Sequence, residues 1–474
     1  YLQCASPSSL QSHGAIVTLR LLGLLVKHGS EPSLQSALDA AVTESPLPPW
    51  ERIVPQLLSR LAHPDSNAAA RVEAILLRLA AQNPHLIVYP AVVESTKLTE
   101  ALDSDLVDQV RLLIAELRRI SLLWDEAWVS LLSKLSTDVA RRSHTLEKEA
   151  TRVERNAFLP DNEKRALAQR KFVAMMKPVL LALATLAKDT IETTSQTPHE
   201  HWFAHHFGPL ITSALSTFQR CLDPNDDLAL QLLRPSQSQP THTLSSRLAN
   251  PWVQCLWSPF EDILKRLNAC QRRSSLQMAS ISPVLASWES SLVHMPGMPT
   301  LQIHRVAPDV QILATKTKPK CFELVGSDGV SHRYLLKARE DLHLDERIMQ
   351  LLATVNGCLG SDKQAMHYDL SARHYNVIPL ANDVGLIQMV RHVTPLFQIY
   401  TAAATTGPSS TTTASTDVNS VAAAPTAPFY AKLKQHGITN VTPSGRPHWP
   451  LTTLRQVYTD LVNEHPKTNV LLAE

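Results

Sequence analysis

The chain has little of several features that mark particular classes of protein. Its six cysteines lie far apart and form no Cys-x-x-Cys pair, so we expect reduced thiols in the cytoplasm, or also in the nucleus, and no structural zinc site. No apolar run approaches the roughly 18–20 residues that a membrane span requires. The first residue is Tyr1 and no basic-then-apolar leader follows it, which is typical of a piece of a longer protein without a secretory signal.

Glycine, aromatic residues and net charge are also low. The 474 residues include 13 glycines and 5% aromatic residues, whereas the helix formers Leu and Ala are plentiful. This composition predicts a mainly α fold with a smaller α+β part, in two to four domains. The formal charge of +2 comes from acidic and basic residues that are nearly matched and interspersed, so it gives no signal for direct nucleic-acid binding.

The most informative pattern is a lysine at the end of an apolar strand, followed by closely spaced carboxylates. Lys337 ends the run Tyr-Leu-Leu-Lys, and Glu340 and Asp345 follow it. Upstream, an Asp328-Gly329 pair between two alternating apolar runs predicts a β-hairpin. A strand lysine that reaches polyphosphate, with an acid from the next helix beside it, is how a nucleotide pocket begins.

Several motifs, in order from about 310 to 397, carry a family resemblance. They are Thr-Lys-Thr-Lys-Pro-Lys, Gly-Ser-Asp-Gly, Glu-Asp-Leu-His-Leu-Asp-Glu-Arg, Ala-Arg-His-Tyr-Asn-Val-Ile-Pro-Leu and Gly-Leu-Ile-Gln. This run resembles the amino-terminal kinase lobe of the phosphatidylinositol 3-kinase-related protein kinases. Within that family it is most similar to the branch that acts in nonsense-mediated mRNA decay. The chain has no Gly-x-Gly-x-x-Gly and no Walker motif, which excludes an ordinary protein kinase or a P-loop NTPase.

The resemblance implies ATP as the nucleotide and assigns roles around its phosphates. Lys337 would contact the phosphates, and Glu340 and Asp345 would orient the lysine. The bend 314–318 stands at the family's phosphate-loop position, with Thr315 as a hydroxyl donor and Lys316 as a long-range cation. An unpaired buried ammonium is costly, so at least one acid is expected to approach Lys337.

The adenine end of the pocket is also implied by resemblance. Tyr375 would lie deep in the nucleotide cleft, and the segment through Met389 and Val390 would be the hinge whose backbone binds the adenine edge. The family usually has tryptophan where this chain has Met389, which predicts softer stacking on the base. The apolar walls would be Leu313, Leu336 and Ile387.

One family element is missing from this sequence. No Asp-Arg-His-x-x-Asn catalytic loop and no Asp-Phe-Gly-like metal site follow Trp449. Phosphoryl transfer needs a group near the attacking hydroxyl and carboxylates that hold Mg2+ or Mn2+ against the phosphates, so we expect these groups beyond Glu474, and we expect no turnover from this piece alone. No catalytic residue and no metal ligand is assigned within the chain.

The remaining segments are divided by composition and resemblance. We expect a helical-repeat segment resembling the FAT region at 1–110, an FRB-like four-helix bundle at 111–225, linker helices at 226–300, the kinase amino-terminal lobe at 301–400, a disordered Ala/Thr/Ser/Pro insert at 401–428, and the start of the carboxy-terminal lobe at 429–474. In the FRB-like region, an apolar stripe from Leu113 to Leu135 predicts one continuous helix face. His201 and His205 are four residues apart, but they are better explained as solvated helix histidines than as metal ligands.

The resemblance implies a serine/threonine protein kinase that transfers the ATP γ-phosphate to Ser or Thr followed by Gln. Its natural substrate would be the RNA helicase of nonsense-mediated mRNA decay, and regulatory protein subunits are expected as partners. Three alternatives stay open: a growth-signalling or DNA-damage kinase of the same family, a helical scaffold that has lost transfer chemistry, and, less favoured, a lipid kinase.

Overall fold

The computed structural model describes residues 7–223, 251–270, 273–289, 292–313, 315, 317–390, 393–396, 399, 427–438 and 449–464. The chain divides into two compact units, Tyr1–Met389 and Val390–Glu474. Within the described ranges, no helix has the length and apolar character needed to cross a bilayer.

The first unit begins with short helices that stack on one another. Prolines at or near helix starts, such as Pro48 and Pro84, begin new helices because proline fits the first turn, where its missing N–H is not needed. Trp50, Leu57 and Ile75 are fully buried between these helices. The helices are α1 (Pro7–Lys27), α2 (Gln35–Glu44), α3 (Pro48–Glu51), α4 (Val54–Leu58), α5 (Ser66–Gln82), α6 (Pro84–Glu94) and α7 (Thr96–Glu100), with a 3-10 turn at Pro32–Leu34.

The prediction of one continuous helix from Leu113 to Leu135 is wrong, because the helix is interrupted at Leu122 and Leu123. Helix α8 (Ser104–Ser121) ends before Leu122, and α9 (Trp124–Glu154) begins after Leu123, whose backbone is extended and whose N–H is capped by Glu126. The break sends the two halves of the stripe into different cores. Residues of α8 pack under the sheet, and residues of α9 pack within a helical bundle.

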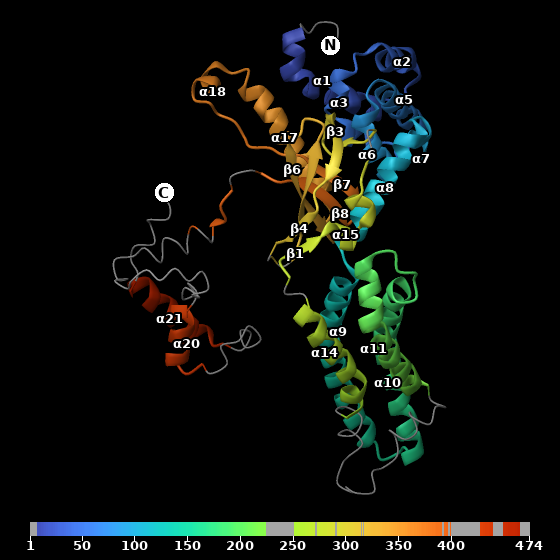
Figure 1. Ribbon diagram of the computed structural model, residues 1–474, viewed down its shortest axis with the longest axis vertical. Helices are drawn as coiled ribbons and strands as arrows, with labels where there is room; N and C mark the ends of the chain where they lie inside the picture. The colour runs from blue at the N-terminus through green and yellow to red at the C-terminus, as the bar shows by residue number, and fades with distance from the viewer. Residues whose placement is uncertain are drawn as a thin grey trace. The chain divides into compact units, whose positions relative to one another are not determined.

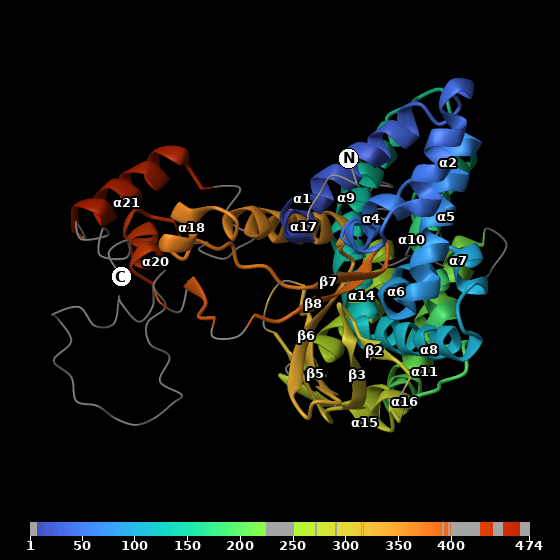
Figure 2. The same ribbon diagram turned by 90° about the horizontal axis from the view of Figure 1, so that it is seen from above.

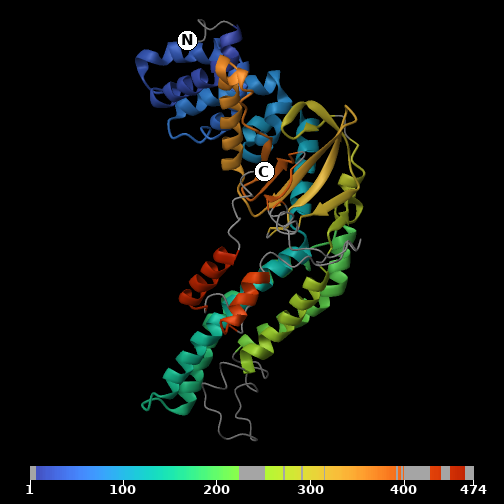
Figure 3. The same cartoon turned by 90° about the vertical axis from the view of Figure 1, so that its left-hand side faces the viewer.

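Helix α9 packs with three other helices, α10 (Asp161–Thr190), α11 (Pro198–Leu222) and α14 (Pro251–Cys270), which run side by side with it in Figures 1 and 3. Their shared core contains Trp128, Phe172, Phe203 and Phe260, each fully buried. The fourth helix therefore comes from the region 226–300 that was predicted as linker helices. Its Trp257 donates to Ser136 of α9 at 3.3 Å.

An antiparallel sheet follows the bundle in sequence. Its path among the described residues is β1-β4-β5-β6-β8-β7, with β3 pairing both β2 and β5. The strands are β1 (Ser275–Gln277), β2 (His294–Met295), β3 (Met298–Val306), β4 (Asp309–Ile312), β5 (Lys320–Gly326), β6 (Ser331–Ala338), β7 (Val377–Ala381) and β8 (Val384–Gln388). Two short helices, α15 (Met278–Ile281) and α16 (Pro283–Ala286), lie between β1 and β2 in sequence.

The predicted hairpin at Asp328-Gly329 is confirmed as the turn between β5 and β6. Gly329 has φ of +75°, a conformation that glycine adopts readily, and its N–H donates to Gly326 at 2.9 Å. After β6 the chain forms α17 (His343–Leu359) and α18 (Lys363–His367) before returning as β7. Figure 2 shows α17 extending from the sheet beside α1 and α4, and α17 contacts both α1 and β7.

In the second unit, α20 (Ala427–Gln435) and α21 (Leu451–Glu464) pack against each other. Both coincide with the helices predicted at the start of a carboxy-terminal lobe. The predicted disordered insert lies outside the described residues, except for its last two positions, which begin α20.

Candidate active site

The two faces of the sheet differ, and strand alternation assigns each residue to one of them. Register pairs Leu336 with Lys320 on β5 and with Leu386 on β8, and these residues share a face with Phe322 and Tyr334. This core face is buried against helices that include α8. The opposite face, called the nucleotide face here, carries Cys321, Leu335, Lys337, Gly385 and Ile387.

Lys337 lies next to the last residue of β6 and is paired with an acid. Its Nζ donates to Oε2 of Glu340 at 2.8 Å, and the side chains are 26% and 33% exposed. The intervening Arg339 has φ of +61°, which reverses the chain so that Glu340 returns toward the lysine. The prediction that an acid approaches this ammonium agrees with the structure, and the pair leaves the lysine accessible from solvent.

Gly385, opposite Lys337 on β8, allows the next segment to approach the nucleotide face. A Cβ at this position would meet Leu342 at 2.7 Å and the Ile378 carbonyl oxygen at 2.9 Å. Leu342 is buried and directly precedes α17, so the glycine lets the start of that helix pack beside the lysine. The helix side of the site therefore depends on the absence of a side chain at 385.

The bend between β4 and β5 lies at the same end of the sheet as Lys337, since Lys320 at the start of β5 pairs with Leu336. The N–H of Leu313 donates to Pro319 at 3.1 Å and closes the bend. By alternation from Gln311, Leu313 falls on the nucleotide face. Thr315 is exposed in the bend, as a hydroxyl donor to a ligand must be, whereas Lys316 lies outside the described residues.

The segment that follows β8 and begins at Met389, called the connector here, lies at the other end of the nucleotide face. Met389 donates its N–H to Arg333 at 2.9 Å, and its sulfur lies 3.5 Å from Sγ of Cys321. Four residues of strand, roughly 13 Å, separate Arg333 from Lys337. A nucleoside triphosphate has its base and its phosphates at opposite ends. On this face Ile387 and Met389 are apolar and Lys337 is a cation at the far end, while Arg333, which shares the face near Met389, is paired with Glu323 at 3.3 Å.

One predicted wall residue is wrong. Leu336 is fully buried on the core face, because adjacent strand residues point to opposite faces and Lys337 occupies the other one. Leu335, two residues before the lysine and half-buried, takes the place assigned to it. Cys321 was also missed; it lies opposite Leu335, and burial raises the pKa of its thiol, so it serves as a small apolar group beside Met389. Period-two alternation counted from Lys337 is the signal that would have found Leu335.

For the remaining predicted residues, Tyr375, Asp345 and Val390, the structure shows no contact with Lys337 among the described ion pairs and hydrogen bonds. Tyr375 is half-buried just before Asn376, whose carbonyl accepts from the Gln388 N–H at 2.8 Å, so it lies near the connector. Asp345 is exposed in the first turn of α17, and among the described ion pairs only Glu340 reaches Lys337. Val390 is the first residue of the second unit. Their roles stay predictions.

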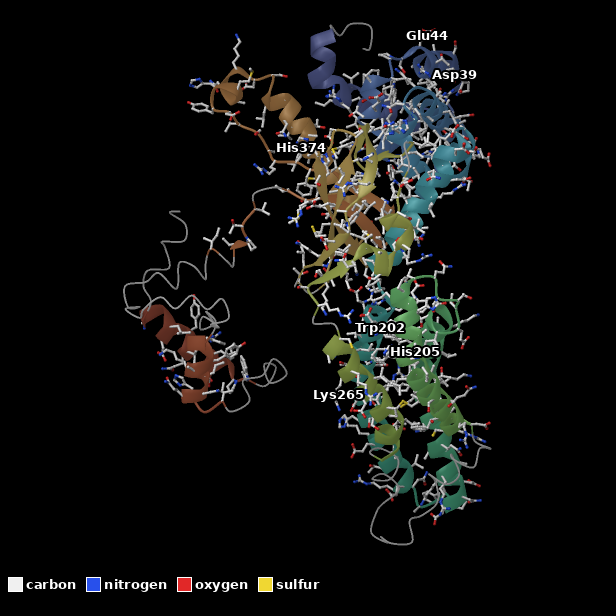
Figure 4. The ribbon with its side chains drawn as sticks, in the orientation of Figure 1. Asp39, Glu44, Trp202, His205, Lys265 and His374 are labelled. Carbon is white, nitrogen blue, oxygen red and sulfur yellow. The ribbon has the colours of Figure 1, made fainter. Side chains whose placement is uncertain are left out.

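The stretch that leads to Tyr375 is tied to α17. Asn356 donates to Ala372 at 2.7 Å and accepts from its N–H at 2.7 Å. Figure 4 shows His374 on this stretch, between α18 and the sheet. The same helix carries Glu346, whose pKa burial raises to about 7.

Histidines of the bundle form no metal site in the part of the chain that the structure describes. His201 and His205 are exposed on α11, where Figure 4 labels His205. His199 is instead buried beside Asp125, with Nε2 at 3.5 Å from Oδ1, and burial lowers its pKa to about 4. No group of three His, Cys, Asp or Glu residues within the described ranges is placed to hold a metal ion.

Comparisons with known proteins match this part of the chain to a kinase family. Residues 331–449 match the model of the phosphatidylinositol 3- and 4-kinase family, a range that begins at β6 and includes Lys337 and the connector. The serine/threonine-protein kinase SMG1 of Danio rerio is 34% identical over 462 residues, covering 81% of this chain and 12% of the relative. Smg1 of Drosophila melanogaster is 30% identical over 502 residues, covering 96% of this chain and 14% of the relative.

Another serine/threonine-protein kinase is less similar to this chain. The serine/threonine-protein kinase tor1 of Schizosaccharomyces pombe is 25% identical over 394 residues, covering 79% of this chain and 14% of the relative. The chain thus spans between 12% and 14% of the length of these three relatives. The order of motifs, the sheet that presents Lys337 and the extended identity agree with one another, and the chain belongs to the phosphatidylinositol 3-kinase-related protein kinase family, with SMG1 kinases among its relatives.

Proposed function

We propose that this chain carries the ATP-binding lobe of a serine/threonine protein kinase that phosphorylates Ser or Thr followed by Gln. The observation that supports it best is the nucleotide face itself. Lys337 and Glu340 form an accessible ion pair at one end, and the apolar side chains of Leu335, Ile387 and Met389 lie on the same face toward the other end.

Different residues of this face would contact different parts of ATP. The Lys337 ammonium would neutralise charge on the phosphates, and Glu340, which accepts a hydrogen bond from that ammonium, would orient it. Thr315, in the exposed bend, would donate its hydroxyl to a phosphate oxygen. Backbone groups of the connector would bind the adenine edge, and the base would lie over Leu335 and Ile387, which are neighbours on the nucleotide face. Mg2+ or Mn2+, when bound with ATP, would neutralise further phosphate charge.

The protein substrate rests on family resemblance. We propose the RNA helicase of nonsense-mediated mRNA decay, with the hydroxyl of a Ser-Gln or Thr-Gln site attacking the γ-phosphate, losing its proton and releasing ADP. The SMG1 relatives are named as serine/threonine-protein kinases, which supports hydroxyl side chains as acceptors. We propose regulatory subunits as further partners, in the cytoplasm or the nucleus.

The test is phosphorylation of matched peptides by the purified protein that carries this sequence. Transfer to a Ser-Gln peptide, with little to the same peptide bearing Ser-Ala, would support the proposal. Incorporation of phosphate into phosphatidylinositol but not into the peptide would favour a lipid kinase. ATP binding with no transfer to any acceptor would favour a scaffold that has lost the chemistry.

A further inference from the structure

A lysine on the core face of the sheet is almost completely buried. Lys320 begins β5 and is 1% exposed, and its Nζ donates to Oε2 of Glu126 at 2.6 Å and to the Ser121 carbonyl at 3.1 Å. Lysine is almost never fully buried unless it is paired, because an isolated ammonium loses its hydration. This ion pair joins a strand of the sheet to the helices.

Glu126 accepts a second hydrogen bond, which shows that Lys320 is bonded to the start of α9. The same Oε2 accepts from the N–H of Leu123 at 2.9 Å, in the cap that begins α9. Ser121 is the last residue of α8. Lys320 therefore binds the corner at which α8 ends and the longest helix of the bundle begins.

A second contact joins α9 to the next strand. Arg339, in the left-handed turn after β6, donates from Nη1 to the hydroxyl of Ser130 on α9. This turn is the one that brings Glu340 back to Lys337. Helix α9 thus holds the start of β5 and the end of β6, the two neighbouring strand ends at the cationic end of the nucleotide face.

Strand register brings the buried ion pair close to the nucleotide lysine. Lys320 pairs with Leu336, the residue directly before Lys337. Because adjacent side chains point to opposite faces, the anchored lysine lies on the core face and the nucleotide lysine projects from the other. A shift of α9 against β5 would move the backbone that presents Lys337.

We propose that Lys320 is a positioning residue: through its ion pair with Glu126 it uses α9 to fix the strand ends that present Lys337 to the phosphates of ATP. This proposal rests on the nucleotide site proposed above. It makes helix α9 of the bundle and the phosphate end of the nucleotide face one mechanical unit, in which the orientation of α9 sets the affinity for the charged part of the nucleotide.

The test separates positioning from general stability by comparing two ligands. The double variant Lys320→Met with Glu126→Gln removes both buried charges and keeps an acceptor for the α9 cap, so no unpaired charge is left inside. In the complete 474-residue chain we expect its Kd for ATP to rise about 5- to 10-fold, because small displacements of a binding group are costly. The Kd for adenosine, which has no phosphate, is expected to stay within about twofold.

A matched control lies in the helical segment. Arg71 is also a buried cation paired with an acid, its Nε lying 2.7 Å from Oδ1 of Asp39, and Figure 4 shows Asp39 in that segment, away from the sheet. Arg71→Met should lower Tm without changing the ratio of the two Kd values. An equal weakening of ATP and adenosine binding in the Lys320 variant, or no weakening at all, would overturn the positioning role.

Lys337→Ala, measured beside these variants, keeps the two proposals distinguishable. If Lys337→Ala leaves ATP binding unchanged, the nucleotide site itself is wrong. If it weakens ATP binding while the Lys320 and Glu126 double variant does not, the site stands and only the positioning role is lost. Should the double variant fail to fold, Arg339→Ala, which removes the exposed contact with Ser130, is expected to weaken ATP about twofold to threefold with adenosine unchanged. No change in either ligand would contradict the proposal.

Discussion

In the full-length protein that carries this sequence, replacing Lys337 with alanine should abolish phosphorylation and hardly change stability. The lysine and Glu340 are 26% and 33% exposed, and partly exposed ion pairs of this kind contribute up to about 1 kcal/mol. Lys337 lies in the unit Tyr1–Met389, and for a unit of that length a loss of about 1 kcal/mol lowers Tm by only about 1 °C. The fold does not depend on this lysine, because its neighbour Leu336 supplies the buried contacts of the strand.

The effect on ATP should be much larger. A hydrogen bond that involves a charged group contributes about 1.5–3 kcal/mol, which corresponds to an increase in Kd of roughly 10- to 150-fold. Adenosine lacks phosphates, so its Kd should be unchanged. Isothermal titration calorimetry with ATP and adenosine, together with a thermal melt, measures all three quantities on one sample.

The matched control is Lys265→Ala. Lys265 is also a lysine with an acid three residues away, but its side chain is 75% exposed on α14, where Figure 4 labels it. Its loss should change neither ATP binding nor Tm. If Lys337→Ala binds ATP as tightly as the wild type does, or loses adenosine binding to the same extent, the assignment of Lys337 to the phosphates is refuted.

Three further predictions concern the two leucines before Lys337, Glu346 on α17 and His199 on α11. Leu336→Ala should destabilise the protein by about 2–5 kcal/mol through a core cavity, whereas Leu335→Ala should weaken adenosine binding and change Tm little, as melts and titrations of both variants would show. Burial raises the pKa of Glu346 from 4.5 to about 7, so stability should fall as pH rises through that interval, by at most about 3 kcal/mol, and Glu346→Gln should melt higher than the wild type at pH 8 but not at pH 4. Burial lowers the pKa of His199 from 6.5 to about 4, so the stability that the neutral imidazole contributes is lost as pH falls through that interval. His199→Gln should therefore reduce the loss of Tm on acidification. For Glu346 or His199, a plot of Tm against pH with the same slope in variant and wild type would contradict the assignment.

Local patterns in the sequence were enough to predict the elements around Lys337. The Asp-Gly turn, the apolar alternation of β5 and β6, and the run of carboxylates after the lysine are all encoded within about 25 residues. The same alternation, followed strictly, would have chosen Leu335 instead of Leu336. Leu336 is the immediate neighbour of Lys337 and therefore points to the opposite face, whereas Leu335, two residues away, shares the face of the lysine.

Contacts between distant segments could not be predicted in the same way. The apolar stripe from Leu113 to Leu135 keeps helical spacing across the break at Leu122. The corner there is stabilised by the local cap from Leu123 to Glu126 and by the tertiary bond from Lys320 to Glu126, 194 residues apart, which helical spacing does not reveal. The place of α14 in the bundle was likewise missed, because helical periodicity predicted a linker helix within 226–300 but does not show which core its apolar face joins. Long-range packing decided both outcomes.

Labelling with an acyl-phosphate derivative of ATP, which transfers its acyl group to a lysine near the bound phosphates, tests the central claim most directly. We expect peptide mapping to find Lys337 as the modified residue, and we expect an excess of ATP to prevent the modification. Modification spread over exposed lysines such as Lys265, or modification of Lys337 that ATP does not prevent, would contradict it.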